Sequence, residues 1–239
     1  MESSATFPDN AVKAIADGQL RLALNKVREG FGSPRRQAAV DRLPEFDALR
    51  DAACDIKNHA IAHLDLYLER FERRVVESGG VVHWCETPHE ARELILQLCQ
   101  EVDARTVTKG KTMVAEEIGL NPFLEAHGIV PIETDLGEYI IQLADEPPSH
   151  IIAPAIHKTK DQVADLFHEH HQAYGKSERL DDPGELVNEA RQVLRRKYIE
   201  ADVGITGANF MLAETGSTVI VTNQGNGDLT QTLTQRHIL

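Results

Sequence analysis

Two lysines stand on either side of a glycine in the run TKGKT at residues 108–112, which follows a predicted strand and opens a predicted helix. Ammonium groups, free backbone N–H groups and the positive end of a helix dipole all attract anions. The run is not a nucleotide-binding P-loop, because that pattern requires glycine where Arg105 stands. It indicates a site for a small anion, and the alternative is a solvated turn that carries two surface lysines.

Three carboxylates, Glu133, Asp135 and Glu138, follow directly after a predicted strand at residues 129–132. Open α/β sheets bind their ligands beyond the carboxyl ends of the strands. One such carboxylate could act as a general base, and another could bind a metal ion or a hydroxyl group. The alternative is a helix N-terminus whose acidic residues complement the helix dipole.

Glycine and hydroxyl residues are concentrated in three turns near the C-terminus, at residues 204–209, 213–218 and 222–227. Glycine lets a backbone approach a ligand closely, and short polar side chains supply hydrogen bonds without bulk. Glu214 lies among them. The concentration favours a polar pocket, and tight turns between strands are the alternative.

The histidines do not predict a metal site. His59 and His63 have a ligand spacing on a predicted helix, but the residues between them lack the glutamate of a zinc-peptidase helix. His168, His170 and His171 fall on a helix that we expect to be exposed. Neither group has an evident third ligand, so we predict no metal ion.

The cysteines Cys54, Cys85 and Cys99 are far apart in the sequence and odd in number. This pattern excludes a disulfide framework, a four-cysteine zinc site and a complete set of iron–sulfur ligands within the chain. We therefore expect buried free thiols.

The composition sets the class of protein. The 239 residues are 41% hydrophobic and 26% charged, which is enough apolar material for a packed core. A formal net charge of -13 repels nucleic-acid backbones and anionic lipid, so we exclude both as general partners. No apolar run reaches about 18 residues and the N-terminus lacks the pattern of a signal peptide, so we expect no membrane insertion and a cytoplasmic protein.

The first third of the chain is predicted to be helical. Apolar residues recur at helical spacing over residues 10–28 and 44–78, and glycines at 79–80 end the pattern. We interpret residues 1–79 as a helical arm, partly exposed or packed on a partner.

Residues 80–239 alternate strand and helix signals. Short apolar strands are predicted at residues 81–84, 106–108, 129–132, 151–153, 202–206 and 218–222. Capping patterns mark helix starts at Thr87, at Thr159 with Gln162, and at Asp182. This alternation predicts an α/β domain with a mainly parallel sheet and helices on both faces.

Four sequence runs occur in this order at residues 108–121, 133–143, 150–158 and 204–226. Taken together they resemble the lactate utilisation protein B family, and the resemblance extends over residues 31–227. It implies a fold similar to that of coenzyme A transferases and sugar-phosphate isomerases. It also implies a cytoplasmic system of several lactate utilisation proteins that oxidises L-lactate to pyruvate, in which this member passes electrons through [4Fe-4S] clusters.

In that family the cluster ligands belong to a ferredoxin-like segment that follows the present domain. This chain ends at Leu239, directly after an apolar, strand-like run, and contains no such cysteines. We therefore expect a further segment downstream, and no cofactor in the chain itself.

The matching motif positions are candidate site residues. Lys109 and Lys111 are the candidates for binding an anionic group such as a carboxylate or phosphate. The candidates for lining the pocket are Thr206, Gly207, Asn209, Thr215, Gly216 and Asn223. The candidate acids or bases are Glu133, Asp135, Glu138 and Glu214.

Three functions stay open at this point. The first is that of the N-terminal domain of an iron–sulfur protein of lactate oxidation, which serves as a scaffold or ligand-binding part. The second is that of a small-anion-binding enzyme of isomerase or transferase type. The third is that of an interaction module that docks through its helical arm. A ligand site requires that the loops near Lys109, Asp135, Thr206 and Gly216 share one cavity.

Overall fold

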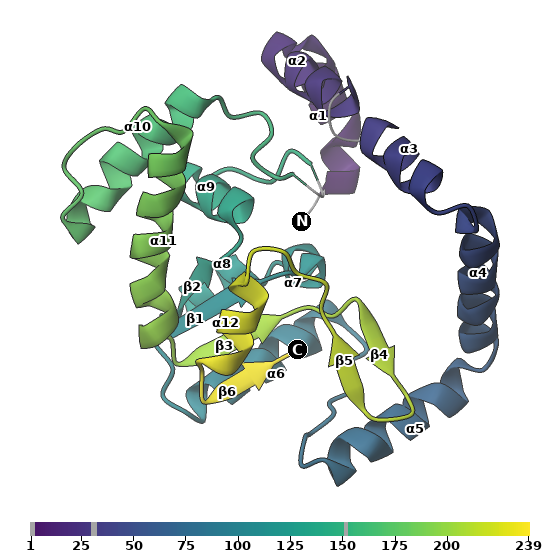
Figure 1. Cartoon of the computed structure of the whole chain (residues 1–239). Coiled ribbons are helices and arrows are strands. Elements are labelled where there is room, and N and C mark those ends of the chain that lie inside the picture. The colour runs from purple at the N-terminus through teal and green to yellow at the C-terminus, as the bar shows by residue number, and fades with distance from the viewer. Residues whose placement is uncertain (1–2, 30–32, 151–152) are drawn as a thin grey trace. The chain divides into compact units, whose positions relative to one another are not determined.

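The computed structural model describes residues 3–29, 33–150 and 153–239 (Figure 1). The helices are α1 (Ser3–Ala16), α2 (Gly18–Val27), α3 (Ser33–Arg42), α4 (Phe46–Ala62), α5 (Leu64–Glu77), α6 (Pro88–Gln100), α7 (Met113–Glu117), α8 (Leu120–Ala126), α9 (Leu136–Ala144), α10 (Lys160–His170), a 3-10 helix (His171–Tyr174), α11 (Pro183–Glu200) and α12 (Asn226–Thr232). The strands are β1 (Thr106–Gly110), β2 (Val130–Glu133), β3 (Val203–Thr206), β4 (Phe210–Leu212), β5 (Ser217–Val219) and β6 (Arg236–Ile238).

The chain forms two compact units. The helical unit holds Thr6–Trp84 together with Phe210–Val219, and the sheet unit consists mainly of Cys85–Asn209 and Ile220–Leu239. The β4–β5 hairpin thus belongs with the N-terminal helices, although it lies far from them in the sequence. The predicted domain boundary at residue 79 stays a prediction.

A four-stranded parallel sheet forms the centre of the sheet unit, in the order β2-β1-β3-β6. Thr106 pairs with Val130, Val107 with Val203, and Val203 in turn with Arg236. The mainly parallel α/β sheet expected from the sequence is therefore confirmed. The similarity to coenzyme A transferases and sugar-phosphate isomerases stays a prediction.

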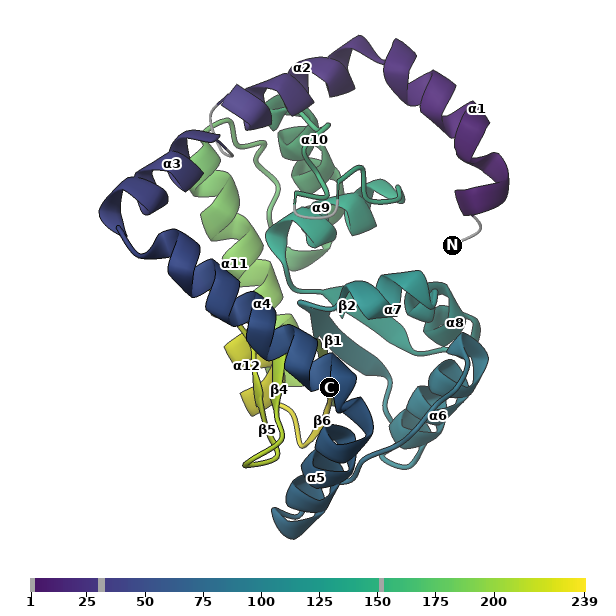
Figure 2. The same cartoon turned by 90° about the vertical axis from the view of Figure 1, so that its right-hand side faces the viewer.

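Helices cover both faces of this sheet (Figure 1, Figure 2). On one face α6, α7 and α8 pack on the sheet through a core that includes Leu96, Leu124 and Val107. On the other side α9, α10 and α11 share a second core around Phe167 and Leu194, and α12 packs against β1 and β3. Side chains alternate along a strand, so successive residues of β1 face different helices.

The predicted helix starts of the sheet unit are confirmed by their hydrogen bonds. The Thr87 hydroxyl accepts from the Glu90 N–H at 3.2 Å, and the Asp182 carboxylate accepts from the Glu185 N–H at 3.0 Å. Thr159 forms a complete capping box before α10. Each bond satisfies a backbone donor that has no partner within its helix.

Two predictions for the helical segments need correction. The long helix predicted over residues 44–78 is interrupted at His63, which separates α4 from α5. The helix predicted over residues 10–28 is likewise interrupted at Asp17, whose carboxylate caps α2. Apolar spacing continues across both interruptions, and periodicity alone therefore does not reveal them.

The predicted strands also differ from the structure in two places, and a third predicted strand falls largely outside the described residues. Residues 81–84 form no strand; Val81 is 73% exposed and Trp84 is 58% exposed, so neither is buried against a sheet. The strand predicted at 218–222 is β5, which pairs antiparallel with β4 and not with the parallel sheet. The strand predicted at 151–153 falls largely on residues 151–152, which lie outside the described residues.

Within the described part of the chain, no helix has the length and apolar character needed to span a membrane.

Candidate functional site

The carboxyl ends of β1, β2 and β3 lie side by side in the sheet unit. Lys109 on β1 is in register with Glu133 on β2, and Gly110 is in register with Thr206 on β3. Parallel pairing therefore brings together the lysine motif, the acidic motif and the first glycine-rich turn. This is the edge at which open α/β sheets bind ligands.

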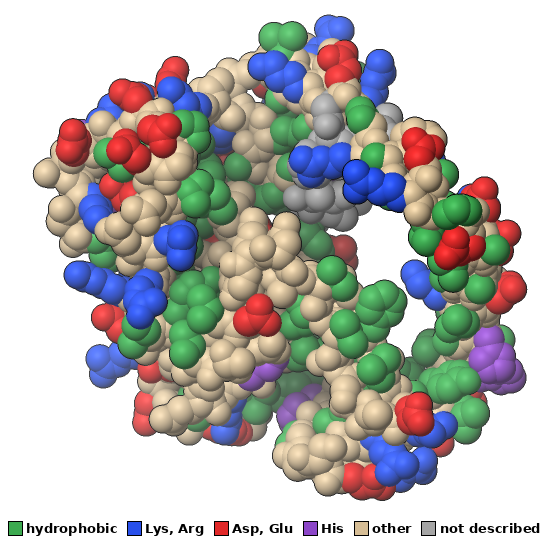
Figure 3. Space-filling model, in the orientation of Figure 1, with side chains coloured by type: hydrophobic (Ala, Val, Ile, Leu, Met, Phe, Trp, Pro, Cys, Tyr) green, Lys and Arg blue, Asp and Glu red, His purple; other side chains and the backbone are tan. Residues whose placement is uncertain are grey.

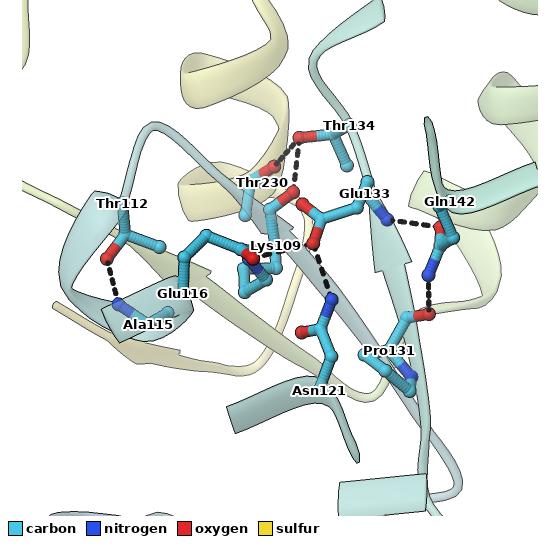
Figure 4. Close-up of polar contacts among 10 residues, drawn as sticks. All are labelled: Lys109, Thr112, Ala115, Glu116, Asn121, Pro131, Glu133, Thr134, Gln142 and Thr230. Atoms are coloured by element: carbon cyan, nitrogen blue, oxygen red, sulfur yellow. Dashed lines mark hydrogen bonds and ion pairs between the residues drawn. The ribbon is translucent and has the colours of Figure 1, made fainter. Parts of the chain in front are cut away.

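Lys109 is the centre of a buried ionic cluster (Figure 4). Its side chain is 1% exposed, and its ammonium group lies 2.7 Å from Glu116 Oε1 and 2.8 Å from Glu133 Oε1. Asn121 Nδ2 donates a third bond to this cluster, to Glu133 Oε1 at 2.6 Å. Burial lowers the pKa of Lys109, but the two carboxylates outweigh it and raise that pKa above its ordinary value. Lys109 is therefore a buried cation that carboxylates already surround.

A cavity of about 410 Å³ opens beside this cluster. Its polar lining comes from β2, α7, α8, α9 and the segment after α9. The acidic and polar lining residues are Glu116, Asn121, Glu125, Glu133, Glu138, Gln142, Asp145, Glu146 and His150. Because this lining is dominated by carboxyl groups, it disfavours the small anion that the lysine motif alone suggests. The cavity is better suited to proton transfer than to binding an anion.

Glu138 has the carboxyl group best suited to that chemistry. Burial, followed by the negative charge of Glu133, raises the pKa of Glu138 to about 8. Burial also raises the pKa of Glu133, against the opposing effect of the Lys109 ammonium. One buried oxygen of each carboxyl group, Oε2, has no hydrogen-bond partner among the described residues. A carboxyl group that holds a proton near neutral pH beside a second carboxyl group is what general acid–base catalysis requires.

Lys111 and Asp135 form a separate, half-buried ion pair at the same edge of the sheet. Lys111 Nζ lies 2.7 Å from Asp135 Oδ2, and the other Asp135 oxygen accepts from the Gly137 N–H at the start of α9. Asp135 therefore caps the N-terminus of α9, which is the alternative given above for the acidic motif. Lys111 has a φ of 58°, a left-handed conformation that is uncommon for a residue with a side chain.

The glycine-rich turn after β3 is held by contacts within the protein. Thr206 Oγ1 and His237 Nε2 lie 2.7 Å apart, and Asn209 Oδ1 accepts from the Val221 N–H at 2.7 Å. Gly207 packs against the Lys111 carbonyl oxygen, and Asn223 is exposed in the loop before α12. A ligand-binding role for these residues stays a prediction.

The turn that holds Glu214, Thr215 and Gly216 belongs to the helical unit, where it joins β4 to β5. A Cβ atom at Gly216 would lie 2.6 Å from the carbonyl carbon of Arg74 and from the nitrogen of Val75. Close packing of the hairpin on α5 therefore accounts for this glycine. A role for the three residues in a ligand site stays a prediction.

Gly216→Ala is expected to destabilise the helical unit more than Gly79→Ala does. Both glycines have a positive φ, which costs a residue with a side chain about 1–2 kcal/mol. Only Gly216 also meets backbone atoms at 2.6 Å, whereas a Cβ at Gly79 meets nothing within 4 Å. Overpacking should add about 1–3 kcal/mol at Gly216, measured by urea unfolding. Equal losses for the two variants would contradict the proposed contact with α5.

Sequence reasoning missed two members of the buried cluster. Glu116 lies on α7 and Asn121 lies at the start of α8. Both belong to the sequence run at residues 108–121, but the sequence alone gives neither of them a role in the site. Their convergence on Lys109 and Glu133 depends on how these short helices fold back over the sheet. The spacing of the residues in the sequence contains no sign of it.

His171 was predicted to be exposed and is fully buried. Its Nδ1 lies 2.8 Å from Glu189 Oε1, and its Nε2 lies 2.9 Å from the Tyr139 hydroxyl. The prediction was wrong because the chain leaves α10 at this point and turns inward as a 3-10 helix.

In the part of the chain that the structure describes, no three histidine, cysteine or acidic side chains are grouped as metal ligands.

Comparison with known proteins places these features in a family. The LUD domain family matches residues 68–239. Lactate utilization protein B of Geobacillus thermodenitrificans is 45% identical over 208 residues, which cover 87% of this chain and 43% of that protein. Lactate utilization protein B of Bacillus subtilis is 41% identical over 238 residues, or 97% of this chain and 48% of that protein.

A third relative, from Escherichia coli, is named uncharacterized electron transport protein YkgF. It is 40% identical over 236 residues, which cover 99% of this chain and 49% of that protein. The chain thus spans about half the length of the curated relatives it matches. No solved structure matches it.

Proposed function

Because this chain belongs to the LUD domain family, we propose that it takes part in lactate utilisation. The observation that carries this proposal is the 40–45% identity to relatives named lactate utilization protein B or electron transport protein. In two of these relatives that identity extends over nearly the whole chain. The aligned region therefore includes the segments that contain Lys109, Glu133 and Glu138.

The finer form of the proposal concerns the reaction. The chain serves in the oxidation of L-lactate to pyruvate, as part of an electron-transfer protein that works with other lactate utilisation proteins in the cytoplasm. A [4Fe-4S] cluster requires four thiolate ligands, and this chain has three cysteines. The expectation of buried thiols is wrong for Cys54 and Cys85, which are exposed, whereas Cys99 is buried and its burial raises the pKa of the thiol to about 11. These residues do not fit a cluster, so we place any such cluster outside these 239 residues.

Growth on L-lactate tests this proposal. Deleting the coding region for these 239 residues in the host is expected to abolish growth on L-lactate and to leave growth on pyruvate unchanged, since pyruvate lies after the oxidation step. The gene supplied from a plasmid should restore growth. Normal growth of the deletion strain on L-lactate, with no second copy of the gene present, would refute the proposal.

A second candidate, an enzyme that transfers a proton, is favoured by the pair Glu133 and Glu138. A carboxyl group with a pKa of about 8 that lines a cavity is a candidate general acid or base. Glu138→Gln keeps the shape of the side chain but cannot exchange a proton. If the variant folds and still supports growth on L-lactate at the wild-type rate, lactate utilisation does not depend on proton transfer by Glu138. Glu125→Gln, an exposed residue of the same cavity, is the matched control.

A further inference from the structure

A second and larger cavity of the sheet unit, about 790 Å³, lies between α11 and α12. Figure 3 shows hydrophobic side chains gathered there, with basic side chains of α11 beside them. Its apolar lining includes Leu136, Val187, Ala190, Leu194, Leu229 and Leu233. Cavities of about 300–1,000 Å³ with mostly apolar walls and a few polar groups are typical of small-molecule sites.

The charged residues of this lining are all basic. Arg191 and Arg195 lie one turn apart on α11, and no acidic residue lines the cavity. Among the residues that the structure describes, neither guanidinium group has an ion-pair or hydrogen-bond partner. In a chain with a net charge of -13, two unpaired arginines beside an apolar cavity make a local site for an anion.

Asn226 supplies an independent sign of a ligand. This residue lines the cavity, is only 4% exposed, and has neither its Nδ2 nor its Oδ1 bonded to any described group. Leaving a buried donor and acceptor unpaired costs about 1–3 kcal/mol, so such groups normally have partners. The side chain packs over the end of β1, where a Cβ at Gly110 would stand 3.4 Å from Asn226 Nδ2. A ligand that both accepts and donates a hydrogen bond would satisfy it.

We propose that this cavity binds a small organic anion with an apolar body. Arg191 and Arg195 hold its anionic group, the leucines and Val187 enclose its apolar part, and Asn226 bonds to a polar group at the buried end. The site is distinct from the acidic cavity beside Lys109: Glu133 lines that cavity, and its neighbour Thr134 lines this one. Successive residues of an extended chain face opposite sides, which explains this division.

Calorimetric titration of the 239-residue chain with decanoate tests the proposal. Decanoate is expected to bind in a 1:1 ratio, and decyltrimethylammonium, with the same chain length and the opposite charge, at least about tenfold more weakly. The double variant Arg191→Gln/Arg195→Gln should weaken the binding of decanoate at least about tenfold. Arg196→Gln, which changes the next residue of α11 outside the cavity lining, should leave it unchanged.

Asn226→Leu separates a ligand-binding role from a structural one. Without a ligand, the thermal midpoint should rise by about 2–4 °C, because an unsatisfied amide is replaced by an apolar side chain of similar size. Calorimetry with decanamide, whose head group both donates and accepts hydrogen bonds, should show at least about fivefold weaker binding to this variant. The proposal is overturned if decanoate does not bind at about 1 mM, if the cationic probe binds equally well, or if the arginine variants bind like the wild type.

Discussion

Lys109→Met is expected to lower the free energy of unfolding by about 3–5 kcal/mol, the cost of breaking a buried ion pair by removing one partner. The substitution leaves Glu133, whose side chain is 4% exposed, without the cation that compensates its charge. It also leaves Glu116 nearby, so two carboxylates would repel each other where one ammonium group now separates them. Urea unfolding monitored by circular dichroism measures the loss.

Two further variants decide whether the uncompensated charge is the cause. Lys109→Met/Glu133→Gln removes the buried negative charge as well, and should recover at least half of the lost stability. Lys111→Met breaks the Lys111–Asp135 pair, whose side chains are 22% and 21% exposed, and should cost about 1 kcal/mol or less. If the double variant is no more stable than Lys109→Met, the loss comes from packing and the charge argument is wrong.

The buried cluster shows what the sequence could and could not predict. The sequence predicts strands at residues 106–108 and 129–132, and in the structure these strands extend to include Lys109 and Glu133 at their carboxyl ends. Their pairing follows from the parallel topology that alternating strands and helices predict. The predicted acidic motif and lysine motif therefore meet, but the lysine faces carboxylates instead of solvent.

The parts that the sequence did not predict depend on long-range packing. The β4–β5 hairpin joins the N-terminal helices because Gly216 lets it approach α5, a contact between residues more than a hundred positions apart. Helix α12 is short and lacks a strong apolar period, so the sequence does not predict it. Asn226 lies inside a predicted glycine-rich turn. Its side chain is buried without a hydrogen-bond partner because α12 packs on β1 and β3, and the sequence does not predict that packing.

The stability of the protein is expected to fall as the pH rises from about 4.5 to 8, with a slope of up to about 1.4 kcal/mol per pH unit from Glu138 alone. Its pKa is raised from 4.5 to about 8 in the folded protein, chiefly by burial and then by the charge of Glu133. Between these two values the folded state holds a proton that the unfolded chain has released. The stabilisation is thus complete below pH 4.5 and is lost as the pH rises through 8.

Glu138→Gln should remove this dependence, because an amide is neutral at every pH in the range. Measured by urea unfolding, the stability of the variant relative to the wild type should increase by about 2–3 kcal/mol between pH 6 and pH 9. Glu125→Gln, at an exposed position of the same cavity, should follow the wild-type curve throughout. A constant difference between Glu138→Gln and the wild type would mean that Glu138 does not hold a proton near neutral pH. The acid–base function proposed for the cavity would then lose its basis, while the charge balance around Lys109 would be unaffected.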